Sequence, residues 1–298
     1  MSPLPKMPTF NVIGFPFLKQ VLLSQGWTED KENADFAYTW KGEGKLRRIP
    51  GSGYVGAGGK RAFFRILATQ GFTKYLPITY TKIEDVPQVD QTYFVKGDYG
   101  SYSAQIAVFH SYAALRAGVP KLPFAASYVI QPSIDRPLLH EGYKQSFRVY
   151  VLTLASGEVY VYRRIFAALS GKPYSPQSRE LEAHVPGFKG AKRVEVTNPQ
   201  LRWIITRAAA DVGHAYNNEV PYKGATYALY GVDVIVDEDG KPWVIENNVS
   251  CDITPSVVQD QTRNAIITDM ARDLYTLLIA PRVLGTTAVP GMWHLVPA

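Results

Sequence analysis

Apolar residues return at helical spacing in four stretches of the chain. Between 201 and 217 they recur every three or four positions, and a second long stretch of this kind covers 257–279. Shorter ones cover 15–24, which Gly26 follows, and 60–70. An apolar stripe of this period places one face of a helix on the core, so the pattern predicts four amphipathic helices.

Other stretches alternate or are continuously apolar over short lengths, as strands do. They cover 34–40, 92–96, 127–131, 147–154, 158–164, 227–236 and 242–247. Ser156-Gly157 and Asp237 to Gly240 are turn sequences, so the strands on either side of each are predicted to pair as hairpins. The stretch 173–192 is rich in Pro, Gly and charge and is predicted to be an exposed loop. Strands and helices interleave, which indicates an α/β or α+β protein.

The composition fits a globular protein with some preference for anions. The chain has 298 residues, 46% of them hydrophobic and 19% charged, with a formal net charge of +6. A basic surface attracts nucleotides, acidic peptides or nucleic acid, although a mildly basic solvated surface explains the same number. Aromatic residues do not interleave with a basic stripe in any known motif, which argues against nucleic acid.

The sequence is expected to belong to a cytoplasmic, soluble protein with no membrane partner. No uncharged apolar run reaches the ~20 residues of a membrane helix, and the first residues do not read as a signal peptide. Cys251 is the single cysteine, which fits a reducing compartment. We expect it to pack near the second hairpin and not to act as a nucleophile.

The second hairpin, in which strands 227–236 and 242–247 flank the Asp237 to Gly240 turn, carries candidate metal ligands. Side chains alternate along a strand, so Glu246 and Asn248 share one face, and the turn brings Asp233 within one or two pleats of Glu246. Two carboxylates and an amide oxygen form a hard-oxygen set of the kind that Mg²⁺ uses together with phosphate oxygens. The alternative is an ordinary hairpin whose polar residues face solvent.

Seven segments, in order along the chain, resemble one family. The strongest is "YGVDVIVDEDGKPWVIENNVSCDITPS" (230–256); with it stand "YVIQPSIDRPLLHEGYKQSFRVYVL" (128–152), "VYVYRRIFAALSGKPY" (159–174) and "VTN" (196–198). Weaker segments are "LLSQGWTEDKENADFAYTW" (22–40), "RRIPGSGYVGAGGKRAFFRIL" (47–67) and "KYLPITYTKIEDV" (74–86). Together they resemble the tubulin-tyrosine-ligase-like family of the ATP-grasp superfamily.

This resemblance implies an α+β (α/β) ATP-grasp fold with antiparallel sheets in a central and a C-terminal lobe and a smaller N-terminal α/β lobe. The expected boundaries are 1–88 for the N-terminal lobe, 89–135 for the central lobe and 136–298 for the C-terminal lobe. The implied activity is an ATP- and Mg²⁺-dependent carboxylate–amine ligation through an acyl phosphate. It would join an amino acid or another carboxylate substrate to an acceptor, and an acidic peptide or protein would suit the net charge.

The resemblance also assigns expected roles to individual residues. Lys96 and Lys144 would contact ATP phosphates, and the hinge from Gln131 to Ile134 would hold adenine. Arg148 and Arg163, on paired strands, would neutralise the transferred phosphoryl group. Asn198 would lie near the phosphates or the substrate, with His184 as a rival in that region. The metal ligands would be Asp233, Glu246 and Asn248. Backbone N–H groups of the glycine-containing loop 97–101 would approach phosphate oxygens, and 49–59 is a second glycine-rich loop.

Departures from the family pattern leave the substrates open. Ser146 stands where the family has an acidic residue, and "VTN" lacks the family's histidine. Two further readings therefore stay open: an ATP-grasp ligase for small molecules, and a non-catalytic ATP-binding interaction module. Whether tubulin is an acceptor also stays open.

Overall fold

The structure is a computed structural model that describes residues 7–39, 44–48, 58–99, 105–187, 192–219, 227–251, 253–255 and 260–297. Positions 49–57 of the first glycine-rich loop and positions 100 and 101 of the second lie outside the described residues.

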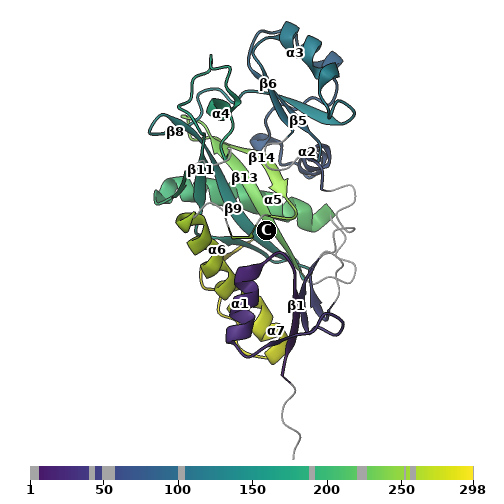
Figure 1. The fold of residues 1–298 in the computed structure, drawn as a ribbon, viewed down its shortest axis with the longest axis vertical. Helices are drawn as coiled ribbons and strands as arrows, with labels where there is room; N and C mark the ends of the chain where they lie inside the picture. The colour runs from purple at the N-terminus through teal and green to yellow at the C-terminus, as the bar shows by residue number, and fades with distance from the viewer. Residues whose placement is uncertain are drawn as a thin grey trace, which may run out of the picture.

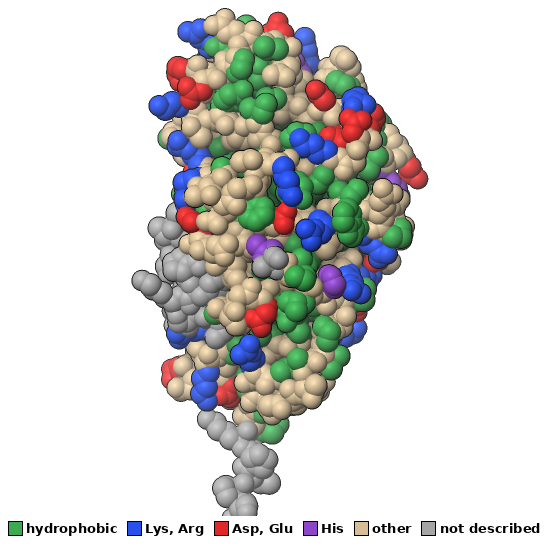
Figure 2. Space-filling view, turned by 180° about the vertical axis from the view of Figure 1, so that it is seen from behind, with side chains coloured by type: hydrophobic (Ala, Val, Ile, Leu, Met, Phe, Trp, Pro, Cys, Tyr) green, Lys and Arg blue, Asp and Glu red, His purple; other side chains and the backbone are tan. Residues whose placement is uncertain are grey.

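The molecule is elongated, with a large sheet between two smaller ones (Figure 1). The small sheet that runs from β5 (Tyr93–Gly97) to β7 (Tyr128–Pro132), with α3 (Tyr112–Gly118), lies at one end. The sheet of β1 (Thr9–Val12), with α1 (Pro16–Ser24) and α7 (Ala280–Leu284), lies at the other. Seen from behind, lysine and arginine side chains are interspersed with acidic and hydrophobic ones over that face (Figure 2).

The N-terminal sheet is parallel and packs against helices from both ends of the chain. Its order is β2-β1-β3-β4. Its apolar residues share one core with helices α1 and α6, which contact each other. The elements are β1 (Thr9–Val12), α1 (Pro16–Ser24), β2 (Thr28–Glu29), β3 (Phe36–Tyr38) and β4 (Leu46–Arg47).

A three-stranded antiparallel sheet, in the order β6-β5-β7, forms the second layer. Its buried face is small and includes Tyr93, Val95 and Ile130, packed with Leu115 of α3. After the first sheet, the elements up to the last strand of this one are α2 (Lys60–Thr69), η2 (Thr73–Tyr75), η3 (Ile83–Asp85), β5 (Tyr93–Gly97), β6 (Ile106–Phe109), α3 (Tyr112–Gly118), η4 (Val119–Lys121) and β7 (Tyr128–Pro132).

The large sheet is built around β9, a twelve-residue strand. Along one edge, β9 pairs with β11 near its start and with β10 near its end. Along the other edge it pairs with β13, which in turn pairs with β14. All of these pairings are antiparallel. The strands are β8 (Leu139–His140), β9 (Tyr143–Leu154), β10 (Val159–Tyr162), β11 (Phe166–Leu169), β12 (Arg193–Glu195), β13 (Tyr227–Val236), β14 (Pro242–Asn248) and β15 (Trp293–Val296).

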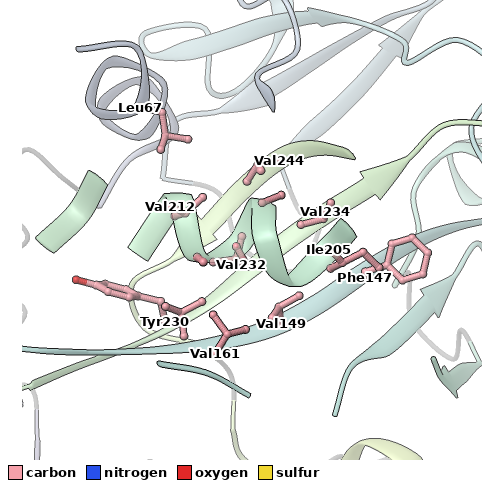
Figure 3. Packing of buried hydrophobic residues seen from close by; sticks show 14 of the residues in the cluster. Leu67, Phe147, Val149, Val161, Ile205, Val212, Tyr230, Val232, Val234 and Val244 are labelled. Carbon is pink, nitrogen blue, oxygen red and sulfur yellow. The ribbon is translucent and has the colours of Figure 1, made fainter. Parts of the chain in front are cut away.

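Helix α5 (Pro199–Glu219) covers one face of this sheet. Ile205 and Val212 of the helix lie against Val149, Val232 and Val234 of β9 and β13 (Figure 3). Val232 and Val234 are two apart on β13, and Val149 is opposite Val232 on β9, so all three side chains point to the same face. The helical face predicted for 201–217 is therefore confirmed as a core face.

The opposite face of β9 changes character along the strand. Near its end, Tyr150, Leu152 and Leu154 pack into the N-terminal core with α1 and α6. At its start, Lys144, Ser146 and Arg148 lie on that same face, because they continue the two-residue alternation. The N-terminal layer covers only the apolar half, so the polar half is left to form a site.

Most predicted elements are confirmed, with two differences. The predicted helix 257–279 is α6 (Gln261–Leu274), a π-helical turn η5 (Tyr275–Ile279) and α7 (Ala280–Leu284), and residues 257–259 lie outside the described residues. The predicted exposed loop 173–192 contains the short helix α4 (Leu181–His184), in which Ala183 and His184 are buried. No helix among the described residues is long and apolar enough to cross a bilayer.

The mixed α+β class with antiparallel sheets in the central and C-terminal parts is confirmed. The lobe boundaries at 88 and 135 remain predictions.

Candidate functional site

A cavity of about 280 Å³ lies where the three-stranded sheet meets the polar half of the large sheet. Both sheets, α2 and α6 contribute side chains to it, so residues far apart in the sequence meet there. The charged residues that line it are Lys60, Lys96, Lys144, Arg148, Arg193, Asp233, Glu246 and Arg263. Six of these eight are cations and two are carboxylates, so the cavity is suited to an anion.

Asp233 and Arg148 form the centre of the site. They are directly opposite each other on β13 and β9, and Arg148 Nε and Nη2 donate to the two oxygens of Asp233 at 2.6 and 2.8 Å. Asn248 Nδ2 donates to Asp233 Oδ2 at 3.0 Å. Burial alone would lower the pKa of Arg148, but the charge and hydrogen bonds of Asp233 outweigh it and raise that pKa. Arg148 is therefore a permanent cation.

Glu246 lies beside this pair. It is opposite Asp233 in the β13–β14 ladder, and Lys60 Nζ is 3.2 Å from its Oε1. A register shift next to Asp233 and Val234 places Ile245 beside Glu246 on the cavity wall. The predicted convergence of Asp233, Glu246 and Asn248 on one face is therefore what the structure has.

The donor set fits a hard divalent cation. Among the residues that the structure describes, no group of three or more His, Cys, Asp or Glu is arranged around a metal position. The three side chains here supply two carboxylates and one amide, and Mg²⁺ commonly takes one or two carboxylates and completes its shell with phosphate oxygens and water. The carboxylates are balanced by Lys60 and Arg148, cations that a metal-bound phosphate would also attract.

Two further lysines, the half-buried Lys96 and the buried Lys144, line the cavity together with these carboxylates. Lys96 Nζ donates to Gln131 Oε1 at 2.9 Å, and Gln131 in turn donates to Thr79 Oγ1 at 2.9 Å. Burial lowers the pKa of Lys96 to about 8, against the opposing effect of Glu246. Burial and then the charge of Lys96 lower the pKa of Lys144 to about 7. Lys144 Nζ lies 4.9 Å from the ring centroid of Phe94 and 5.4 Å from that of Tyr174.

The hinge strand β7 borders the same cavity. Gln131, Pro132 and Ile134 line it next to Lys96 and Lys144. The expected adenine-binding segment and the expected phosphate lysines are therefore adjacent, as a single nucleotide requires.

His184 also lines the cavity, although the sequence places it in a loop. It is 1% exposed, its Nε2 lies 2.6 Å from the Ser178 carbonyl oxygen, and its ring packs against Phe94, His110 and Tyr174. Burial lowers the pKa of His184, so its ring is neutral at pH 7. The alternation of Leu181, Ala183 and Val185 around it is the signal that this stretch is not all exposed.

Two expected site residues lie elsewhere. Arg163 follows β10 and is exposed, with Nη2 3.0 Å from His294 Nδ1, because the cavity face of β9 is bordered by β11 and not by β10 at Arg148. Asn198 is exposed and accepts a hydrogen bond from Leu201 N at 3.0 Å, which makes it the N-cap of α5. The structure brings neither side chain into the cavity, so both assignments are corrected.

Three cations that line the cavity were not predicted from the sequence. Lys60 opens α2, Arg193 opens β12, and Arg263 lies in the first turn of α6. Only the motif containing Lys60 offered a signal, since a glycine-rich stretch followed by a helix places a lysine at a helix N-terminus. Cys251 is buried and packs beside Gly231 of the hairpin, as expected.

Curated relatives match about half of the chain. The "Probable tubulin polyglutamylase ttll-9" of Caenorhabditis elegans is 26% identical over 164 residues, which is 46% of this chain and 39% of that protein. The "Tubulin monoglycylase TTLL3" of Mus musculus is 25% identical over 170 residues, 46% of this chain and 18% of that protein. The chain thus spans less than half the length of these relatives.

A family model covers more of the chain. The model of the tubulin-tyrosine ligase family matches residues 67–188 and 180–282, a range that contains β5 to α6 and most of the cavity. Since the match includes well over half of the sequence in order, and the α+β architecture agrees with it, the chain belongs to the tubulin-tyrosine ligase family.

Proposed function

We propose that this protein is an ATP-dependent ligase that joins a carboxylate to an amine, with an amino acid as one substrate and a peptide or protein as the other. The observation that carries the proposal is the cavity in which Lys60, Lys96 and Lys144 face the carboxylate pair Asp233 and Glu246. Cations opposite paired carboxylates are what a metal-bound triphosphate needs on its two sides.

The nucleotide would lie along the hinge with its phosphates on the lysines. Backbone groups from Gln131 to Ile134 would bind the adenine ring, and Lys96 and Lys144, which line the same cavity, would bind the phosphates. Asp233, Glu246 and Asn248 would hold Mg²⁺, which neutralises phosphate charge when bound. Arg148, fixed by Asp233, is placed to stabilise the charge on the transferred phosphoryl group.

The chemistry proceeds in two displacements. A carboxylate oxygen attacks the γ-phosphorus, the bond from that phosphorus to the bridging oxygen breaks, and ADP leaves with an acyl phosphate formed. The amine then attacks the acyl carbon, phosphate departs, and the amine proton is lost to give an amide. No protein nucleophile is needed, because positioning and charge neutralisation carry both steps.

The names of the relatives guide the choice of substrates. They are a tubulin polyglutamylase and a tubulin monoglycylase, so glutamate or glycine with a tubulin tail is the first substrate pair to test. The net charge of +6 suits an acidic acceptor. A small-molecule ligase is the second candidate, because Ser146 lines the cavity where the family has an acid.

Glu246→Gln tests the proposal. The change keeps the shape of the side chain but removes a charge from the proposed metal site, so ligation of an amino acid to a tubulin-tail peptide should fall by roughly 100-fold or more. Product mass and ADP release would be followed at saturating ATP and Mg²⁺. The melting temperature should change little, because the side chain is 31% exposed.

Glu238→Gln is the matched control, since Glu238 is an exposed turn residue that forms an ion pair with Arg136 and does not line the cavity. Its activity should equal that of the wild type. Full activity in Glu246→Gln would rule out the metal assignment. ATP turnover with small amines but no peptide would favour the second candidate.

A further inference from the structure

Asp98 accepts hydrogen bonds from the first two N–H groups of helix α2. Its backbone carbonyl oxygen accepts from Lys60 N at 3.1 Å, and its carboxylate Oδ1 accepts from Arg61 N at 2.9 Å. The carboxylate is itself held by Ser127 Oγ, which donates to Oδ2 at 3.1 Å. Asp98 is 8% exposed and is not among the residues that line the cavity. A residue from another element therefore caps the first turn of α2.

Gly59 allows this close approach. It directly precedes α2, and a Cβ at this position would lie 2.6 Å from Asp98 Oδ1. Its φ of −91° and ψ of 161° are open to any residue, so it is space and not backbone conformation that requires a glycine here. A larger residue at 59 would push the Asp98 carboxylate away from Arg61 N.

The capping contact joins the two elements that carry Lys60 and Lys96. Asp98 directly follows β5, two residues after Lys96, and Lys60 is the first residue of α2. Helix α2 and the three-stranded sheet lie side by side (Figure 1). The Lys60 side chain is 7% exposed, and its Nζ lies 3.2 Å from Glu246 Oε1 in the cavity. The position of the Lys60 ammonium group therefore depends on where Asp98 holds the start of α2.

We propose that Asp98 is a positioning residue for the nucleotide, which fixes the start of α2 so that Lys60 and Lys96 reach the phosphates together. This inference rests on the proposed function. A lysine that is already held in place loses less side-chain freedom when a phosphate arrives, so its contact contributes more to affinity. The positive end of the helix dipole offsets the charge of the Asp98 carboxylate, which allows an acid to stand behind the cations of an anion site.

A double-mutant cycle with Lys60 tests this role. The affinity for a non-hydrolysable ATP analogue with Mg²⁺ would be measured calorimetrically. Asp98→Ala should weaken it roughly three- to tenfold, the range expected for a lost helix cap. In the Lys60→Met background the same change should weaken it by less than about twofold, because the side chain that Asp98 positions is gone. Asp98→Asn keeps an acceptor for Arg61 N and should restore the affinity to within about twofold of the wild type.

Asp90→Ala is the matched control in the same layer. Asp90 is exposed, and its Oδ1 accepts from Tyr112 N at 3.1 Å at the start of α3, outside the cavity lining. Its loss should leave the affinity unchanged. Gly59→Ala reaches the Asp98 contact from the helix side, so it should weaken binding of the analogue as Asp98→Ala does. It also keeps the inference testable if Asp98→Ala does not fold.

Three results would overturn the inference. They are wild-type affinity in Asp98→Ala or Gly59→Ala, no recovery in Asp98→Asn, and an equal loss for Asp98→Ala with and without the Lys60 side chain. An equal loss is what a cap that only stabilises the helix predicts. Failure of the wild-type protein to bind the ATP analogue would instead refute the proposed function itself.

Discussion

At the scale of single residues, the site is defined by how its charges are balanced. Arg148 has a bidentate carboxylate partner and a raised pKa, so it keeps its charge at every relevant pH. Lys96 is half-buried and Lys144 is buried, and removal from water lowers the pKa of Lys96 to about 8 and that of Lys144 to about 7. The cavity therefore holds Arg148, whose charge is fixed, together with Lys96 and Lys144, whose charge depends on pH.

This difference predicts a pH-dependent affinity for nucleotide. A lysine with a lowered pKa is charged below that pKa and neutral above it, so the free protein loses phosphate-binding charge as pH rises through 7 and 8. The affinity for ATP should fall by up to about tenfold per pH unit per lysine above these values. Near pH 8, binding should take up protons, because a phosphate beside each lysine raises its pKa.

Calorimetry in two buffers of different ionisation enthalpy would measure the proton uptake. Lys144→Met should reduce it, and Lys121→Met, an exposed lysine far from the cavity lining, should not. Identical affinity at pH 6.5 and pH 9 would contradict the lowered pKa values.

At the scale of elements, strand β9 contributes side chains to two hydrophobic cores and to the cavity. The β9 face toward α5 has an apolar centre of Phe147, Val149 and Val151, whereas the other face is polar near its start and apolar near its end. The position of α5 is set by Gly213, where an added Cβ would lie 2.6 Å from Val159 Cγ1 and 2.8 Å from Val151 Cγ1. The helix thus approaches β9 and β10 as closely as a glycine permits.

Gly213→Ala should consequently destabilise the protein. Alanine favours a helix over glycine by up to about 1 kcal/mol, but overpacking against two core valines costs about 1–3 kcal/mol. Urea unfolding should show a net loss of roughly 1–2 kcal/mol. Trp203→Ala, at a position of α5 that is 66% exposed, should stay within about 0.5 kcal/mol of the wild type. A gain in stability for Gly213→Ala would show that the helix can shift outward freely.

At the scale of the whole molecule, the cavity joins the three-stranded sheet, which has a small core of its own, to the large sheet, whose core includes residues of α2. Lys60 comes from α2, Lys96 from β5 of the three-stranded sheet, and Lys144 from the large sheet. A ligand that contacts all three stabilises their mutual arrangement, because it binds only when they are together.

Nucleotide should therefore raise the melting temperature. A non-hydrolysable ATP analogue with Mg²⁺ at about 100 times its Kd adds about 2.7 kcal/mol, which corresponds to roughly 5 °C for a protein of this size. Lys60→Met should show a smaller shift at the same ligand concentration. Lys45→Met, an exposed lysine paired with Asp35 in the N-terminal layer, should respond like the wild type. An equal shift for Lys60→Met would exclude Lys60 from the nucleotide site.

The sequence by itself determined most of the elements and the hairpin that carries Asp233, Glu246 and Asn248. Alternation and turn residues in 227–248 are local, so they were enough to place Asp233, Glu246 and Asn248 on one face, and the helical period was enough for α5. Motifs in collinear order were enough for the family.

Only the tertiary structure decided which other cations join the cavity. Lys60 of α2 lies more than a hundred residues before Arg193 of β12, and Arg263 belongs to a third element, α6. No local period in the sequence predicts that these three side chains line one cavity. The same limit explains the two corrections: Arg163 and Asn198 occupy motif positions, but strand order leaves one beyond β10 and helix capping holds the other at the start of α5. Local sequence fixes which face a side chain is on, and long-range packing fixes what that face meets.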